Sequence, residues 1–352
     1  MENQNQTPHK RRVRYKGKYP KKFEEKYKEL QPEKYKDTIE HVIQKGNTPA
    51  GMHISIMVKE ILDFLNIQPG ETGFDATLGY GGHTKAMLQC LNGKGHIYAT
   101  DVDPEESAKT KKRLAEQGFG EELLTVKLQN FCTIDEIAKE VGGFDFILAD
   151  LGVSSMQIDN PKRGFSFKTD GPLDLRLNQE AGISAARRLD TISREELAGM
   201  LCENSDEPYC EELAKAITDE IRRGNHIDTT TKLRRVIEKT LDFLPEKEKK
   251  ETIKKTCQRT FQALRIDVNH EFEVLYEFME KLPGALKPGG RAAILTFHSG
   301  EDKLVKAALK EGYRAGVYSA YSKDVVRPSA EECVRNPRAR STKMRWAVRT
   351  EE

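Results

Sequence analysis

Glycines and carboxylates that could bind a ligand follow three short apolar runs of this sequence. Gly81, Gly82 and His83 come directly after the first run, Asp101 ends the second, and Asp150 ends a later one. Glycine backbone at the start of a helix lets a ligand approach closely, and a carboxylate at a strand end can accept hydrogen bonds from both hydroxyls of a ribose. The pattern predicts a site for a ligand that contains a nucleoside.

The spacing of the glycines bears on which nucleoside this is. A dinucleotide site favours G-x-G-x-x-G, because the third glycine allows close packing around a pyrophosphate, but Thr84 follows Gly79 and Gly81 at that position. No lysine follows at the spacing of a P-loop. S-adenosylmethionine, which has ribose and adenine but no phosphate, fits better. An NAD-dependent oxidoreductase is the enzymatic alternative, and a plain tight turn is the structural one.

The elements that position these residues follow from the hydrophobic pattern. Apolar runs at 72–77, 96–100, 124–129, 144–150 and 291–297 predict strands, with helices between them and a last strand at 344–349. Strands that alternate with helices favour a parallel, doubly wound α/β sheet. Because parallel strands end at one edge, we expect Asp101, Asp150 and His298 to meet there.

A change in composition and periodicity after the fourth predicted strand predicts an inserted domain. Residues 159–258 are highly charged, have helical periodicity and contain no strand-like run. We therefore expect an α/β sheet domain from 51–158 and 259–352, interrupted by a helical domain at 159–258. Residues 1–50 are a basic extension that is disordered or partly helical, with a short polar helix at 21–45.

The composition of the chain indicates where the protein is located in the cell and what it could bind. The chain has 352 residues, 32% of them charged, and a net charge of only +2, yet residues 1–46 hold 13 Lys and Arg against 7 Asp and Glu. Such a basic arm suits contact with nucleic acid phosphates. The six cysteines form no C-x-x-C pair and no run approaches the roughly 18 apolar residues of a membrane span. We expect a cytoplasmic protein with reduced thiols, no membrane association, no metal and no secretory signal.

Several long motifs resemble one family closely. From about His53 onward the chain is similar to the bacterial 16S rRNA cytosine-N4 methyltransferases, the RsmH family, formerly MraW. The resemblance is carried by FDATLGYGGHT, DLGVSSMQIDNPKRGFSFKTDGPLDLR, RTFQALRI, FHSGED and NPRARS. Gly300 stands in FHSGED where the family usually has leucine, and the basic arm is an addition. The resemblance implies a class I, Rossmann-like S-adenosylmethionine-dependent methyltransferase fold that methylates a cytidine N4 in the decoding region of 16S rRNA.

The resemblance also implies which residues bind the cofactor. Its S-adenosylmethionine positions fall on Gly81, Gly82, His83, Asp101, Phe131, Asp150 and Gln157. Asp101 would hold the ribose hydroxyls, Phe131 would pack on the adenine, and Gln157 would help to close the pocket. A neutral His83 would suffice, because an uncharged imidazole can donate one hydrogen bond.

Methylation of an amine requires a group that accepts its N–H bonds, and structured RNA requires residues that hold the base. We expect Asp150, or a backbone carbonyl beside it, to accept from the amine, with Ser154 or Ser155 assisting. The everted base would contact Arg163, Phe165, Phe167 and His298, and phosphates would contact Arg338 and Arg340. Alternatively, the phenylalanines pack a loop onto a core, and His298 caps a helix.

The expected partner is 16S rRNA, in the form of the 30S subunit, and the protein is a monomer or homodimer. A non-catalytic, rRNA-binding ribosome-assembly factor is the alternative from another class. It would explain the basic segments, but it would not explain why Asp101, Asp150 and the glycines converge at one sheet edge.

Overall fold

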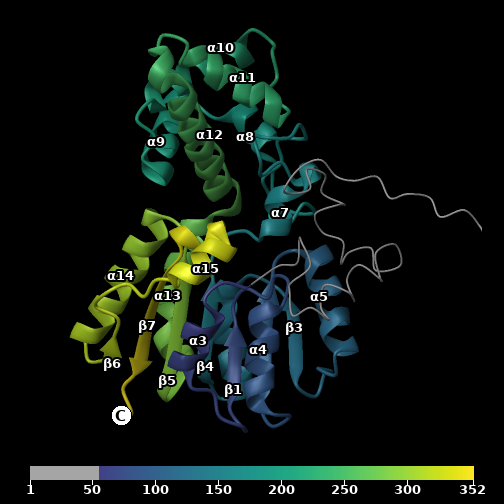
Figure 1. Ribbon diagram of the computed structural model, residues 1–352, viewed down its shortest axis with the longest axis vertical. Coiled ribbons are helices and arrows are strands. Elements are labelled where there is room, and N and C mark those ends of the chain that lie inside the picture. The colour runs from purple at the N-terminus through teal and green to yellow at the C-terminus, as the bar shows by residue number, and fades with distance from the viewer. Residues whose placement is uncertain (1–54) are drawn as a thin grey trace, which may run out of the picture. The chain divides into compact units, whose positions relative to one another are not determined.

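A seven-stranded sheet organises residues 55–352, the part of the chain that this computed structural model describes (Figure 1). Its order is β3-β2-β1-β4-β5-β7-β6. The strands are β1 Thr72–Asp75, β2 His96–Asp101, β3 Leu124–Leu128, β4 Phe144–Asp150, β5 Leu286–Thr296, β6 Tyr318–Tyr321 and β7 Lys343–Arg349. The predicted basic extension and the polar helix at 21–45 lie outside the described residues.

The first five strands are parallel, and β7 pairs antiparallel with both β5 and β6. This confirms the predicted α/β sheet. β1 lies between β2 and β4, so the strand order reverses there, and ligands bind open α/β sheets in the crevice beyond the carboxyl ends at such a point. In register, Asp75 pairs with Ala99 of β2 and with Leu148 of β4, while Asp150 pairs with Leu295 of β5.

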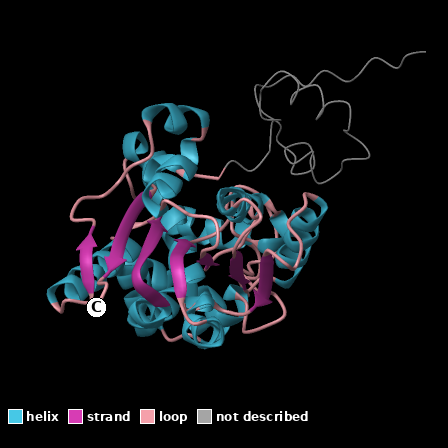
Figure 2. Cartoon of the chain, turned by 90° about the horizontal axis from the view of Figure 1, so that it is seen from below, coloured by secondary structure: helices cyan, strands magenta, loops and turns pink. Residues whose placement is uncertain are grey.

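Helices cover both faces of the sheet (Figure 2). One face packs against α6 Ile134–Val141, α13 Glu271–Ala285 and α14 Ser299–Arg314, and the other against α3 Val58–Leu65, α4 Gly82–Leu91 and α5 Pro104–Glu116. β4 shows why both faces need cover, since Ile147 and Ala149 belong to one core while Phe146 and Leu148 belong to the other. Burial on both faces explains why the sequence of β4 is nearly all apolar.

A helical segment with a separate core follows β4. It contains α7 Ser155–Asp159, the 3-10 turn η3 Pro161–Arg163, α8 Ala185–Thr191, α9 Arg194–Ser205, α10 Cys210–Arg222, α11 Thr230–Thr240 and α12 Glu246–Asn269. Leu197, Leu213, Leu233 and Leu264 are among the residues that fill its core. The proposed boundary between residues 258 and 259 falls within α12, so one long helix leads from this segment back to the sheet.

The carboxyl-terminal part of the sheet differs from the prediction in two details. β6 was not predicted, because its four residues are too few for a periodic signal, and β5 begins at Leu286 rather than Arg291. After β6, α15 Ala330–Arg335 and the 3-10 turn η4 Pro337–Ser341 lead into β7. None of the helices described between residues 55 and 352 is long and apolar enough to span a bilayer.

Candidate cofactor and substrate site

The turn after β1 has a backbone that excludes side chains. Gly79 and Gly81 have φ angles of 48° and 78°, and Gly81 caps the start of α4. A Cβ on Gly81 would lie 2.7 Å from a methyl carbon of Thr110, and one on Gly82 would lie 1.9 Å from the hydroxyl oxygen of Ser55. Only glycine fits at these positions, which leaves bare backbone beside the switch point of the sheet, as a closely approaching ligand requires.

Thr84 takes the place of the third glycine of a dinucleotide site, and its side chain has a defined role. The hydroxyl group is buried and donates a 2.6 Å hydrogen bond to Oδ2 of Asp75, at the end of β1. Helix α4 is therefore held to the strand by a side chain rather than by the close glycine contact of a pyrophosphate-binding turn. This favours the predicted phosphate-free nucleoside ligand over a dinucleotide.

Asp101 organises the glycine turn. Its Oδ2 accepts a 2.8 Å hydrogen bond from the amide of Gly79, and its Oδ1 accepts one of 2.9 Å from the amide of Asp103. Burial raises the pKa of Asp101, these two amides oppose that effect, and the resulting pKa is about 6. A carboxylate has about four lone-pair positions, so two remain for the hydroxyls of a ribose.

His83, which is buried, forms an ion pair with the partly buried Asp150. Nδ1 of His83 lies 3.4 Å from Oδ2 of Asp150, and Nε2 lies 2.8 Å from the carbonyl oxygen of Ile56. Burial lowers the pKa of His83, but Asp150 and the carbonyl group of Ile56 raise it more, to about 8. Both nitrogens face acceptors, so the imidazolium form satisfies the geometry, whereas a neutral ring could donate to only one of them.

One oxygen of Asp150 is left open. Its Oδ1 is buried and has no hydrogen bond partner among the described residues. Polar atoms in such a position usually have a partner, and those without one often mark ligand sites. An acceptor beside the glycine turn and at the end of β4 is placed to receive an N–H group, either from the cofactor or from the substrate.

Ser154 and Gln157 are used in a helix cap. The hydroxyl of Ser154 accepts from the amide of Gln157 at 3.1 Å, and Oε1 of Gln157 accepts from the amide of Ser154 at 2.9 Å. The Gln157 amide group also donates to Oδ2 of Asp103 at 3.1 Å. This capping box fixes the start of α7 beside the site. The predicted catalytic role of Ser154 and the cofactor contact of Gln157 stay predictions.

Asp103 is the residue that sequence reasoning missed. Asp103-Pro104 in the sequence is typical of a helix start, and Asp103 does cap α5, but the same buried carboxylate also faces Gln157 and Arg163. The signal available in the sequence was the repeated carboxylate of Asp101-Val-Asp103 at a strand end. Nothing in that pattern indicates which distant cation pairs with it.

Arg163 is the cation that pairs with Asp103, and its predicted contact with RNA stays a prediction. Its Nη2 lies 2.8 Å from Oδ2 of Asp103, and their side chains are 6% and 1% exposed. Nη2 also donates to the carbonyl oxygen of Leu177 at 2.6 Å. The guanidinium group holds the loop after α7 to the sheet domain, so it is not available to an RNA base or phosphate in this conformation.

Three phenylalanines that were predicted to contact the cofactor or the RNA base pack against other side chains of the protein. Phe165 is buried in the helical core, and Phe167 meets Phe261 edge-on at a centroid distance of 5.9 Å. This favours the alternative that both rings hold the loop. Phe131 directly follows β3 and meets Phe278 edge-on at 5.2 Å, but it is only partly buried, so its contact with adenine stays a prediction.

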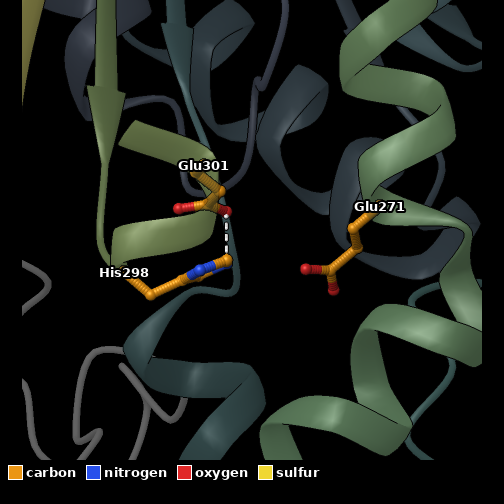
Figure 3. A group of neighbouring side chains, drawn as sticks. All are labelled: Glu271, His298 and Glu301. Carbon is orange, nitrogen blue, oxygen red and sulfur yellow. Dashed lines mark ion pairs between the residues drawn. The ribbon is translucent and has the colours of Figure 1, made fainter. Parts of the chain in front are cut away.

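His298 lies in a cluster of charged residues at the end of β5 (Figure 3). Its Nε2 is 3.3 Å from Oε1 of Glu301, and its ring meets Phe272 edge-on at 5.7 Å. Neither ring nitrogen has a well-aligned hydrogen bond among the described residues. One atom each of Glu271, His298 and Glu301 lies within 4.8 Å of the other two, and Arg265 donates to both oxygens of Glu271.

The basic segment near the carboxyl end contains one open cation. Lys343 and Arg345 both bind Asp302, and Arg338 donates to both carboxylate oxygens of Asp159 at 3.0 Å. Arg340 is exposed, and no residue of the described part of the chain forms an ion pair with it. Of the two predicted phosphate contacts, Arg340 is the more accessible, and Arg338 also joins η4 to α7.

Comparison with known proteins shows similarity along nearly the whole chain. The model of the MraW methylase family matches residues 50–350. "Ribosomal RNA small subunit methyltransferase H 1" of Agathobacter rectalis is 86% identical over 343 residues, which cover 97% of this chain and 98% of that protein. A protein of the same name from Lachnoclostridium phytofermentans is 71% identical, covering 98% and 95%. "Ribosomal RNA small subunit methyltransferase H" of Acidobacterium capsulatum is 38% identical, covering 84% and 97%.

Proposed function

Because this chain belongs to the MraW methylase family, we propose that it methylates N4 of a cytidine in the decoding region of 16S rRNA. Its methyl donor is S-adenosylmethionine. The similar proteins of Agathobacter rectalis and Lachnoclostridium phytofermentans are named as small-subunit rRNA methyltransferases, which supports the RNA as substrate. The N4 position is supported by the motifs described above and by the kind of acceptor found at the end of β4.

The observation that carries the proposal is the open oxygen of Asp150. It lies at the switch point of the sheet, next to a turn where only glycine fits, and no described residue donates to it. An amine nitrogen conjugated to a pyrimidine ring is a weak nucleophile, because its lone pair is delocalised into the ring. An acceptor on its N–H group returns electron density to the nitrogen and fixes its direction of attack.

The residues around the switch point fit the cofactor. Gly81 and Gly82 leave room for its methionine portion, and Asp101 retains lone pairs for the ribose. When bound, the cofactor supplies a methyl group on a positively charged sulfur. Asp150 favours positive charge nearby, and His83 keeps the carboxylate oriented through its contact with Oδ2. Phe131 and Gln157 complete the proposed pocket around the adenine.

The substrate side of the proposal is the 30S subunit. We place contact with RNA phosphates at Arg340, supported by its exposure and by the lack of a described ion pair. The protein acts in the cytoplasm, where this substrate is found, as a monomer or homodimer. The helical segment between α7 and α12, which has its own core, is proposed as a separate domain that shares α12 with the sheet domain.

Methyl transfer from labelled S-adenosylmethionine tests the proposal directly. Purified protein is incubated with 30S subunits, with deproteinised 16S rRNA or with neither, and the labelled nucleoside is identified after digestion. We expect N4-methylcytidine from 30S subunits. Label on a ribose, on another base or on none of the RNA would contradict the proposal. Binding of NAD in place of S-adenosylmethionine in a parallel titration would favour an oxidoreductase.

A further inference from the structure

Two buried acceptor atoms without described partners lie at the ends of neighbouring strands. One is Oδ1 of Asp150, after β4, and the other is Nδ1 of His298, after β5. Asp150 pairs in register with Leu295, and the amide of Leu151 donates to the carbonyl oxygen of Leu295 at 3.1 Å. The strands thus continue side by side to their ends, and both atoms belong to the same rim of the sheet.

The segments beyond the strands also stay together. A Cβ on Gly152 would lie 3.7 Å from the ring of Phe297, the residue before His298. At Gly300, a Cβ would lie 2.6 Å from the ring of Phe272 and 3.2 Å from Nδ1 of His298. Glycine at position 300 therefore accommodates the Phe272 ring and itself adds no side chain beside Nδ1.

Glu301 determines which nitrogen of His298 carries the proton. One oxygen faces Nε2 at 3.3 Å, and the other accepts a 2.9 Å hydrogen bond from the amide of Phe297 (Figure 3). A carboxylate beside Nε2 favours a hydrogen there, which leaves the lone pair on Nδ1.

Arg265 keeps the second carboxylate of the cluster from competing for the ring. It donates to the two oxygens of Glu271 at 2.8 and 2.9 Å. Glu271 is thereby satisfied by a permanent cation, and Glu301 is the carboxylate in ion-pair contact with His298. The cluster has one oriented imidazole with an unused acceptor.

We propose that Oδ1 of Asp150 and Nδ1 of His298 each accept one N–H bond of the substrate amine, with Glu301 as a positioning residue. This inference rests on the proposed function and deepens it. Two acceptors require a group with two hydrogens, so the site selects the primary amine of cytosine. It rejects the carbonyl oxygen of uracil, which would place its lone pairs against those of both acceptors.

The arrangement also accounts for the proton that the reaction releases. As the nitrogen forms its bond to the methyl carbon, the carbon–sulfur bond breaks and its electron pair stays on sulfur. The nitrogen then carries one hydrogen too many, and this proton passes to Nδ1 of His298. Asp150 retains the remaining N–H bond until the product leaves.

Replacing His298 by phenylalanine separates acceptance of a hydrogen bond from stacking, because the ring is kept and the nitrogens are removed. For 30S subunits we expect kcat to fall about 100-fold, typical of a lost general base, while cofactor Kd and RNA Kd change less than about threefold. Glu301→Gln should lower kcat about tenfold, because a glutamine amide can donate to Nε2 and so place the hydrogen on Nδ1. The neighbouring Ser299→Ala is the matched control, with unchanged kcat.

The outcomes distinguish this inference from the proposed function. If wild-type protein forms N4-methylcytidine and His298→Phe does so at the same rate, the two-acceptor arrangement is wrong while the activity stands. A loss that appears only as weaker RNA binding would also overturn it. If wild-type protein methylates no N4 position, the proposed function itself fails. As a second measurement, RNA that already carries N4-methylcytidine at the target should gain no second methyl group, and a dimethylated product would contradict the requirement for two N–H bonds.

Discussion

The strand ends of β2 and β4 both carry carboxylates, but the protein uses them differently. At the end of β2, Asp101 accepts hydrogen bonds from two backbone amides. Asp103 caps the amino terminus of α5, accepts a hydrogen bond from Gln157 and forms an ion pair with Arg163. At the end of β4, one oxygen of Asp150 faces His83 and the other has no partner in the described part of the chain. The protein itself uses the first pair of carboxylates, whereas the open oxygen of Asp150 is the one proposed to bind a ligand.

The largest effect is expected at the end of β2, where the carboxylates already have protein partners. Arg163→Met removes the cation of Asp103 and leaves a carboxylate that is 1% exposed without its charge partner. Breaking a buried pair in this way lowers the free energy of unfolding by about 3–5 kcal/mol. Chemical denaturation measures the change. Arg187→Met, an exposed arginine on α8, is the control, and an equal effect of the two substitutions would show that the buried pair is unimportant.

A substitution of Asp150, at the end of β4, should change the rate of methylation rather than the stability of the protein. Asp150→Asn lowers the acceptor strength of Oδ1, so we expect kcat to fall about 100-fold or more, comparable to the loss of one group that stabilises a transition state. Single-turnover methylation of 30S subunits measures the rate, and calorimetry measures cofactor affinity. An unchanged rate with normal cofactor binding would exclude Asp150 as the acceptor of the amine.

The ion pair of His83 and Asp150 should make the free energy of unfolding decrease as the pH rises above neutral. The pKa of His83 is raised from 6.5 to about 8, so the pair's contribution is complete below pH 6.5 and is lost as the pH rises through 8. A shift of this size corresponds to about 2 kcal/mol. Denaturation at pH 6 and pH 9 should show this decrease in the wild type and little of it in His83→Gln. The same slope in both proteins would locate the effect elsewhere.

Asp101 should give the opposite pH dependence in cofactor binding. Its pKa of about 6 means that the carboxylate is ionised at pH 7.5 and mostly protonated at pH 5, where it accepts hydrogen bonds less well. If only the ionised form binds ribose, affinity at pH 5 is about tenfold weaker than at pH 7.5. Calorimetric titration across this range measures the change. A flat profile would mean that Asp101 serves only the turn.

The smallest effect is expected at the surface. Arg340→Ala should reduce RNA affinity modestly and lower the slope of log affinity against log salt by about 1, as for one lost phosphate contact. Binding is measured at several salt concentrations, with cofactor affinity as the internal control. Arg338→Ala should also lower thermal stability, because its ion pair with Asp159 joins η4 to α7. An unchanged salt slope for Arg340→Ala would remove it from the RNA contact surface.

Much of the sheet could be predicted, because its signals are local. The apolar runs located five parallel strands, and Asp103-Pro104 located the start of α5, where the structure shows the cap. Glycines marked the turn after β1, since their φ angles are those that other residues avoid. Short β6 escaped prediction, and α12 runs through a boundary that charge and periodicity had placed at residue 258.

The sequence by itself determined the strand ends, and therefore the shared edge on which Asp101, Asp150 and His298 lie, because parallel strands must align their termini. The tertiary structure alone decided which side chains remain open there. Arg163, a predicted RNA contact, forms a buried ion pair with Asp103, whereas Asp150 and His298 each keep an atom without a partner among residues 55–352. The reason is physical: partners for buried charges come from segments distant in the chain, here 60 residues apart for Arg163 and Asp103, and no local pattern encodes that pairing.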